Sequence, residues 1–279
     1  MLHDLDDVTM NTASADDMKT IVEFSRAEGW NPGKDDAIIF RATDPKGFYV
    51  AKHKGEVIAS ISVVNHNDTF AYMGFYICRP DYRGKGIGMA LWNHAIKWAG
   101  TRDIGLDGVR EQEANYVKSG FVKVMDSCRY EGQLAGRGHP DIRLAGDDDI
   151  DDLIEMDAAA NGVRRSVFVQ VWTASTPDRK TVMFDDGSGF ATIRACQNGV
   201  KIGPVICDDV NKAMMLVEAC LDLMPSDPVI IDVPEENTAM IKTLTGKGFS
   251  ETFVAARMYR GKVPQISPRL HAIAGMELG

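Results

Sequence analysis

The sequence predicts an α/β protein, with helices and strands mixed in the α+β manner, that folds as two similar domains. Three observations support this prediction. The chain of 279 residues is longer than a typical single domain. Helix and strand patterns alternate along its first half. The second half repeats features of the first, which indicates an internal duplication.

The composition narrows the class of protein. Hydrophobic residues make up 44% of the chain and the mean hydropathy is -0.17, as expected for a soluble globular protein. A net charge of -9 and a pI near 5.2 argue against nucleic acid as the main partner. No apolar run reaches the roughly 18 residues of a membrane span, and the acidic N-terminus (Asp4, Asp6, Asp7) is unlike a signal peptide. We therefore expect a cytoplasmic protein with no membrane partner.

The sequence predicts no metal site. The cysteines stand at 78, 128, 196, 207 and 220, an odd number without a Cys-x-x-Cys pair, so we expect reduced thiols and neither a disulfide scaffold nor a zinc site. The acidic run at 147–152 lacks the alternating ligands, central glycine and closing glutamate of an EF-hand. Acids at a helix N-terminus are the simpler interpretation.

The first half is predicted to form an ordered series of elements. Residues 1–12 form a first strand or a loose lead-in. Ser14 can cap a helix to about residue 28, because acids follow it and apolar residues then recur on one face. The further elements are a helix over 35–41, strands over 48–51 and 57–64 joined by a turn at 54–55, a strand over 69–78, a helix over 86–99, a strand at 104–107, a polar helix and a last strand through 129–130.

A basic glycine loop follows the strand that ends at Cys78. It runs from Pro80 to Gly88 and leads directly into the helix over 86–99. Glycines allow successive backbone N–H groups to face one point, and the helix start adds unpaired amides and a positive dipole end. The expected ligand is a phosphate or pyrophosphate. The spacing matches neither a P-loop nor a Gly-x-Gly-x-x-Gly dinucleotide fingerprint.

The loop contains Arg-x-x-Gly-x-Gly at Arg83, Gly86 and Gly88, between a strand and a helix. This pattern resembles the acyl-CoA pyrophosphate loop of GNAT-family N-acetyltransferases. The resemblance covers roughly residues 5–132 and implies a twisted, mixed but mostly antiparallel sheet flanked by helices. It also implies that acetyl-CoA is the co-substrate, held by these residues: Tyr76, Ile77 and Cys78 along the pantetheine arm, and Arg83, Gly84, Lys85, Gly86, Ile87 and Gly88 at the pyrophosphate.

The same resemblance implies a general acid. Family members carry a tyrosine four residues before a Gly-Phe pair, and here Tyr116 has that place before Gly120. Its hydroxyl is expected to protonate the leaving sulfur, and the neighbouring Asn115 is expected to contact the cofactor. Trp30 stands where the family builds the acceptor wall, although a core position is an equal alternative. The general base stays open among Asp107, Glu28, Asp35, Asp36 and a water chain.

Residues 133–141 have the composition of a linker between an N-terminal domain at 1–132 and a C-terminal domain at 142–279. The two domains share a Gly-Phe pair followed by an arginine eight residues after the phenylalanine, at Arg129 and Arg257. The second domain has Asp208 and Asp209 where the glycine loop belongs, and Leu244 in place of the tyrosine. It therefore resembles a degenerate GNAT domain that shapes the acceptor site or an interface.

These features predict an acetyl-CoA-dependent N-acetyltransferase that acts on a primary amine by direct transfer in a ternary complex. The acceptor would be a small molecule or a protein amine. The alternative is an acyl-CoA-binding regulatory or sensor module without turnover. A homodimer and a self-contained tandem monomer are both open.

Overall fold

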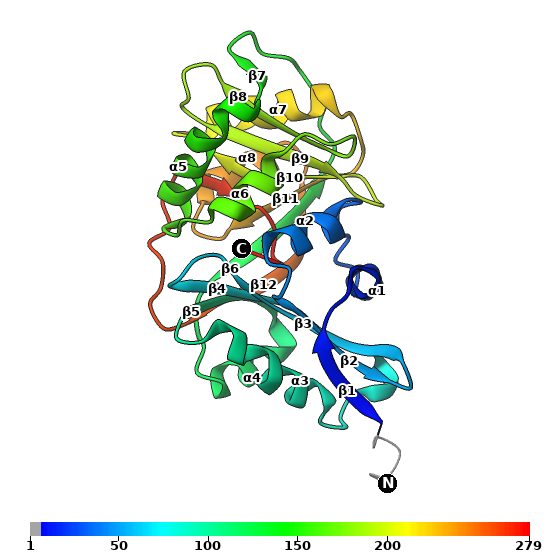
Figure 1. The fold of residues 1–279 in the computed structure, drawn as a ribbon. Helices are drawn as coiled ribbons and strands as arrows, with labels where there is room; N and C mark the ends of the chain where they lie inside the picture. Colours follow the sequence, from blue (N-terminus) through cyan, green and yellow to red (C-terminus); the bar gives the residue numbers. More distant parts are fainter. Residues whose placement is uncertain (1–6) are drawn as a thin grey trace.

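The computed structural model describes residues 7–279 (Figure 1). Residues 1–6, with which the predicted N-terminal domain begins, lie outside the described residues. The first half of the chain forms β1 (Val8–Thr12), α1 (Ala15–Ala27), α2 (Asp36–Thr43), β2 (Phe48–His53), β3 (Glu56–Asn65), β4 (Phe70–Cys78), α3 (Ile87–Ala95), β5 (Asp103–Val109), α4 (Glu113–Lys118) and β6 (Val122–Gly132).

The second half repeats the same kinds of element. It forms β7 (Ile142–Leu144), α5 (Ile150–Asn161), α6 (Ser166–Thr173), β8 (Arg179–Phe184), β9 (Phe190–Ala195), β10 (Val200–Ile206), α7 (Val210–Leu223), β11 (Val229–Pro234), α8 (Thr238–Gly246), β12 (Ser250–Arg260) and β13 (Leu270–Ala272). Acids of the run at 147–152 lie at the start of α5, as predicted, and Asp149 pairs with Arg143.

Local sequence signals account for several boundaries. The Ser14 hydroxyl accepts a hydrogen bond from the Asp17 amide at 3.2 Å, and the Asp17 carboxylate accepts one from the Ser14 amide at 2.9 Å. This capping box confirms the predicted start of α1. The predicted helix over 86–99 changes character instead of running through. Its α-helical part ends at Ala95, and a tighter 3-10 turn covers Ile96–Ala99.

All strands of residues 7–279 belong to one 13-stranded sheet in the order β1-β2-β3-β4-β5-β12-β6-β11-β10-β9-β8-β7, and β13 pairs with β10 off this path. The pairs β4–β5 and β10–β11 are parallel, and the other pairs are antiparallel. The mixed, mostly antiparallel sheet flanked by helices confirms the predicted fold class.

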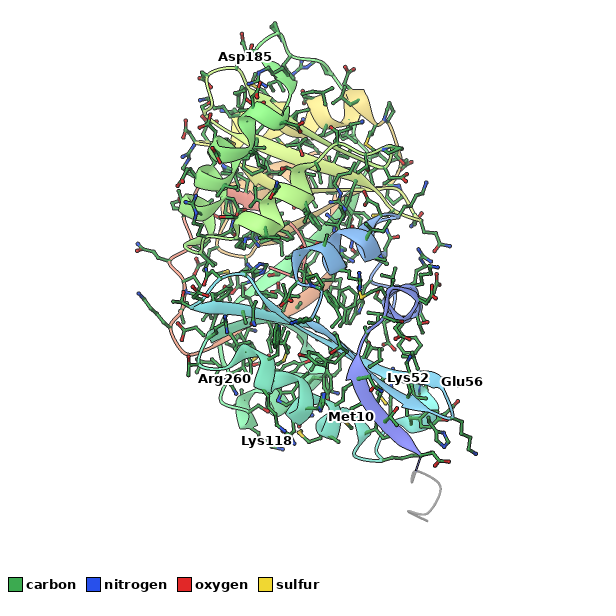
Figure 2. All side chains as sticks on the ribbon, in the orientation of Figure 1. Met10, Lys52, Glu56, Lys118, Asp185 and Arg260 are labelled. Carbon is green, nitrogen blue, oxygen red and sulfur yellow. The ribbon has the colours of Figure 1, made fainter. Side chains whose placement is uncertain are left out.

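The two halves exchange their equivalent strands. β12, from the second half, pairs with β5, whereas β6, from the first half, pairs with β11. The predicted boundaries at 132 and 142 divide the chain, and the hydrogen bonding of these strands crosses that division. Arg260, which ends β12 and is labelled in Figure 2, lies over the ring of Phe121 in the first half, with its guanidinium carbon 5.8 Å from the ring centre.

An ion pair accompanies each exchanged strand. Arg257 on β12 donates from Nε to Oδ1 of Asp107 on β5 at 3.0 Å, and Arg129 on β6 donates from Nε to Oδ1 of Asp232 on β11 at 2.7 Å. Burial raises the pKa of Asp232, but Arg129, together with Lys201 and Arg194, outweighs burial and brings that pKa down to about 2. The repeated arginine spacing in the sequence thus corresponds to two equivalent ion pairs.

The helices form layers around this sheet. In Figure 1, α3 and α4 cover one face of the first half, and their apolar residues pack with β2 to β5. Likewise α7 and α8 pack on β8 to β11. The other helices, α1, α2, α5 and α6, share a core between the two halves with residues 270–279, which we call the C-terminal segment. This segment is buried along its length, and the C-terminus lies near the centre of the molecule.

Candidate active site

The strands β4 and β5 separate in the middle of the first half. Their parallel pairing runs from Phe70–Asp103 to Met73–Leu106 and stops there. On its other side, β4 bulges against β3 between Gly74 and Ile77, with Phe75 at a φ of 49°. The Ser60 hydroxyl donates to the Phe75 carbonyl at 2.9 Å and holds this bulge. Beyond Met73, the β5-facing backbone edge of β4 is therefore left without a strand partner among the described residues.

A groove of about 1360 Å³ empty volume runs from this opening along the glycine loop. We call it the loop groove. It brings together most of the residues predicted to bind the cofactor: Tyr76, Ile77, Cys78, Arg83, Gly84, Gly86 and Gly88. Burial raises the pKa of the Cys78 thiol, against the opposing charges of Arg83 and Lys85, so the thiol stays neutral.

The loop has the geometry of an anion cradle. Gly84 and Gly86 have φ angles of 74° and 81°, the left-handed region that other residues rarely adopt. Gly86 caps α3, so the first amides of that helix face the groove without helical partners. A Cβ on Gly88 would lie 2.8 Å from the Tyr76 hydroxyl oxygen, so a larger residue here would have to displace the Tyr76 side chain. These residues fit a pyrophosphate bound mainly by the main chain.

Three residues predicted to bind the cofactor do not line the loop groove. Ile87 is buried in the core beneath α3. Lys85 is exposed, with its ammonium 5.1 Å from the centre of the Tyr82 ring. Asn115 donates to the Gln112 side chain at 2.8 Å and lies outside the loop groove, because it points away from the sheet on α4 while Tyr116 points inward.

A second cavity opens from the inner end of the loop groove. The empty volume of this inner pocket is about 620 Å³, which includes space open to solvent. It shares Trp30, Tyr76, Val109 and Phe253 with the groove. Its walls come from both halves of the chain, because β12 supplies Phe253 and Ala255 and the C-terminal segment supplies Met276 and Glu277.

Tyr116 lines the inner pocket from α4. Its ring lies 5.9 Å from that of Trp92, centre to centre, and packs so closely on Gly108 that a Cβ there would come within 2.2 Å. Burial raises the pKa of Tyr116, so its hydroxyl is protonated throughout the neutral range. No side-chain hydrogen bond engages that hydroxyl among the described residues. It is placed to donate a proton or a hydrogen bond into the pocket.

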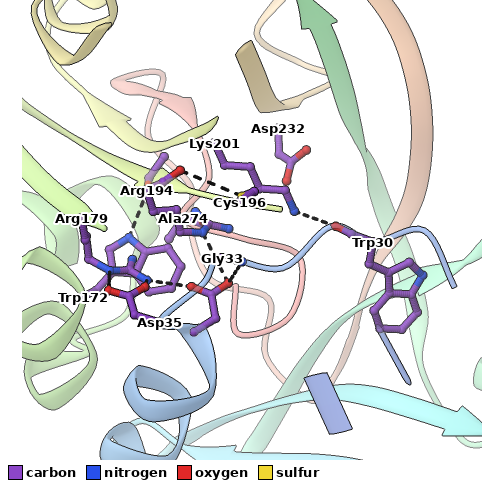
Figure 3. Close-up of polar contacts among 12 residues, drawn as sticks. Trp30, Gly33, Asp35, Trp172, Arg179, Arg194, Cys196, Lys201, Asp232 and Ala274 are labelled. Atoms are coloured by element: carbon purple, nitrogen blue, oxygen red, sulfur yellow. Dashed lines mark hydrogen bonds and ion pairs between the residues drawn. The ribbon is translucent and has the colours of Figure 1, made fainter. Parts of the chain in front are cut away.

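Each carboxylate considered as a general base forms an ion pair with an arginine of the chain. Asp107 lines the inner pocket, but it accepts hydrogen bonds from Arg257, Tyr72 and Ser127. Glu28 pairs with Arg83 at the loop groove. Asp35 and Asp36 both pair with Arg179, and Figure 3 shows Asp35 beside that arginine. A carboxylate that sequence reasoning missed, Glu277, lines the inner pocket.

Trp30 forms part of the wall between the two cavities. Its ring centre lies 6.3 Å from that of Phe75. Its carbonyl accepts hydrogen bonds from Lys201 at 2.8 Å, as Figure 3 shows, and from Arg129 at 3.1 Å. Burial and the neighbouring Arg129 lower the pKa of Lys201. The second half of the chain therefore positions the loop that carries Trp30.

The second half has an equivalent opening, which the chain itself fills. β10 and β11 pair in parallel only at Val200–Val229 and Lys201–Ile230, and β10 bulges between Ile202 and Val205. β13 pairs with β10 in this opening, and the Ile273 amide donates to the Asp232 carbonyl at 2.9 Å. The Asp209 side chain caps α7 where the first half has its glycine loop. In the second half, the chain itself therefore occupies the place that the loop groove has in the first.

Among residues 7–279, no helix combines the length and the apolar character that a membrane span requires. No group of three or more histidine, cysteine, aspartate or glutamate side chains there is arranged to hold a metal ion.

Comparisons with known proteins agree with this architecture. Residues 15–118 match the Acetyltransferase (GNAT) family, and residues 153–272 match an Acetyltransferase (GNAT) domain. The chain is 35% identical over 278 residues to a holothin acyltransferase from Pseudoalteromonas sp. (strain SANK 73390), covering 97% of this chain and 94% of that protein.

Solved structures show the same fold. A putative acetyltransferase from Pyrococcus horikoshii superposes with a TM-score of 0.83 at 19% identity, covering 98% of this chain and 96% of that one. A tandem GNAT protein from the clavulanic acid biosynthesis pathway superposes with a TM-score of 0.62 at 15% identity, covering 91% of this chain and 99% of that one. The chain therefore belongs to the GNAT family and is an N-acyltransferase with two GNAT domains in tandem.

Proposed function

We propose that this GNAT acyltransferase takes acetyl-CoA as its acyl donor and transfers the acetyl group to a primary amine, directly and within a ternary complex. The observation that carries the proposal is that the loop groove and the inner pocket meet at the gap between β4 and β5, with Tyr116 lining the inner one. One cavity fits a pyrophosphate-bearing arm, and the other adjoins it as the place for an acceptor.

In this proposal, different residues of the chain bind the donor, orient it and donate a proton. Acetyl-CoA supplies a thioester. The amides after Gly84 and Gly86 bind its pyrophosphate, and the free edge of β4 orients the pantetheine arm. The Tyr116 hydroxyl donates a proton to the sulfur as the carbon–sulfur bond breaks. The inner pocket holds the acceptor amine and excludes bulk water. The homologous holothin acyltransferase suggests a small-molecule acceptor.

The test is thiol release from acetyl-CoA by the full chain across a panel of primary amines. Amine-dependent release with formation of the N-acetyl product supports the proposal. Tyr116→Phe keeps the stacking on Trp92 and removes only the hydroxyl, so kcat is expected to fall by about 10²–10⁴ while the acetyl-CoA Kd is unchanged. Binding of acetyl-CoA with no turnover of any amine would instead indicate a sensor module.

A further inference from the structure

The loop between α1 and α2 carries Trp30 and rests on the second half of the chain. We call residues 28–35 the wall loop, because Trp30 lines both the loop groove and the inner pocket. Glu28, at the α1 end of the loop, pairs with Arg83 of the glycine loop. The residues after Trp30 contact β9 and the turn that follows it. The wall loop therefore joins the donor side of the site to the second half.

Asn31 binds the turn between β9 and β10, at residues 196–199, through two hydrogen bonds. Its Nδ2 atom donates to the Asn198 carbonyl at 2.7 Å, and its Oδ1 atom accepts from the Asn198 amide at 3.2 Å. Asn31 has a φ of 51°, in the left-handed region that asparagine adopts more readily than most residues. The two hydrogen bonds hold this conformation directly after Trp30, so they set the direction in which the chain leaves that residue.

The following residues of the wall loop continue along β9. Gly33 forms an isolated antiparallel bridge with Cys196, and the Lys34 amide donates to the Ala195 carbonyl at 2.9 Å. A Cβ on Gly33 would lie 3.0 Å from Cδ of Arg194, so the loop lies directly against that strand. Ordering a loop has an entropic cost. These contacts with the second half offset that cost and hold the wall loop in one conformation.

The second half also holds the backbone of Trp30 itself. Lys201 on β10 donates from Nζ to the Trp30 carbonyl, and Arg129 on β6 donates to the same oxygen. Both cations are buried. Figure 3 shows the Trp30 ring on the side of the backbone away from Lys201. The carbonyl is thus fixed on the scaffold side while the ring is presented to the two cavities.

The first half makes the equivalent contact with the loop between α5 and α6. Asn67, in the turn between β3 and β4, donates from Nδ2 to the Arg164 carbonyl at 2.9 Å. Each half therefore binds the helix–helix loop of the other half through a turn of its own strands. The two contacts differ in their surroundings, because neither Asn67 nor Arg164 lines the loop groove or the inner pocket. The Asn67 contact is a structural reference for the Asn31 contact.

On this basis, and resting on the proposed function, we propose that the second half serves as the scaffold of the acceptor wall, and that Asn31 is a positioning residue that sets the KM of the amine through Trp30. Asn31 lines neither cavity, so it acts through its neighbour. A displacement at Asn31 reaches Trp30 through one peptide bond. The second half, whose own opening is occupied by the chain, thereby acts on the site of the first.

The test compares Asn31→Asp with the matched variant Asn67→Asp. Each substitution keeps the Oδ1 acceptor, which bonds the Asn198 amide in one case and the Thr69 amide in the other, and replaces the Nδ2 donor by an oxygen that repels the facing carbonyl. At saturating acetyl-CoA, Asn31→Asp is expected to raise the KM of the best amine about three- to tenfold with kcat nearly unchanged, as for loss of a hydrogen bond that supports binding. Asn67→Asp is expected to keep the wild-type KM.

A second comparison separates positioning from a general loss of stability. In a Trp30→Leu background the ring that Asn31 positions is absent, so adding Asn31→Asp is expected to leave the KM of the amine unchanged. Its effect on Tm is expected to be the same with and without Trp30. Calorimetry is expected to give the same acetyl-CoA Kd for Asn31→Asp, Asn67→Asp and wild type, because none of these changes lines the loop groove.

The outcomes are distinguishable. A rise in KM with Asn31→Asp that is absent with Asn67→Asp and disappears in the Trp30→Leu background supports the proposal. Equal KM values for Asn31→Asp and wild type overturn it and leave the proposed function in place. The same rise with Asn67→Asp, or in the Trp30→Leu background, also overturns it. A wild type that turns over no amine of the panel overturns the proposed function and this inference together.

Discussion

Gly203→Ala tests the role of the C-terminal segment. The substituted residue contacts that segment directly and does not line the loop groove. The new methyl group would lie 2.0 Å from the Ile273 carbonyl oxygen, whereas such contacts essentially never fall below 3.0 Å. The segment must therefore move by about 1 Å, at a cost of roughly 1–3 kcal/mol for an overpacked core. A fall in Tm of roughly 2–12 °C follows for a chain of this length.

The substitution is expected to affect the inner pocket, where the acceptor amine is proposed to bind. Displacement of the segment shifts Met276 and Glu277 in the inner pocket, and an error of about 1 Å in positioning can cost 10²-fold in rate. Steady-state kinetics should show a loss of kcat/KM for the amine, while calorimetry should show an unchanged acetyl-CoA Kd. Gly246→Ala is the matched control, because nothing lies within 4 Å of its Cβ. A Gly203→Ala protein with wild-type Tm and wild-type kcat/KM would refute the reasoning.

Two further predictions concern the loop groove and pH. Gly86→Asp is expected to abolish acetyl-CoA binding, whereas Gly55→Asp, at a similar φ of 84° with open space around it, should bind normally; equal binding by both would contradict the anion cradle. Burial, with Arg165 nearby, lowers the pKa of His66 to about 3, and its ring bonds the Leu278 carbonyl at 2.9 Å. The unfolded chain therefore binds a proton below about pH 6.5 that the folded chain excludes, which removes about 2 kcal/mol of stability by about pH 5. Urea unfolding at both pH values should show this loss in wild type and not in His66→Gln, and an equal loss in both would contradict it.

The elements that the sequence predicted are those encoded by short spacings. The capping box at Ser14, the glycine loop at Arg83–Gly88 and the inward-facing Tyr116 each depend on residues within a turn or two of one another. Such patterns act through local backbone geometry, so they can be recognised without knowledge of the tertiary contacts. The roles of these residues in binding and catalysis stay predictions until they are measured.

The exchange of β6 and β12 could not be predicted in the same way. Both strands follow a Gly-Phe pair and both carry an arginine at the same spacing, so each is compatible with β5 and with β11. The choice depends on contacts between distant parts of the chain. The paired aspartates, Asp107 and Asp232, were the available signal, because each repeat needs a carboxylate to neutralise a buried arginine.

Glu277 was missed for a related reason. The C-terminal segment has no helical or strand periodicity and contains only three residues of strand, at Leu270–Ala272. Its path is determined by close approach to Gly203 and Gly74, which precede their contacts Ile273 and Glu277 by 70 and 203 residues. No spacing within the sequence reports such contacts.

The central claim is that the first domain binds acetyl-CoA and that the C-terminal segment occupies the equivalent opening of the second. Calorimetric titration of the full chain with acetyl-CoA measures the number of sites directly. We expect one site per chain, retained in Gly55→Asp and lost in Gly86→Asp. Two sites per chain would show that the second opening accepts the cofactor, and no binding would contradict the proposed function itself.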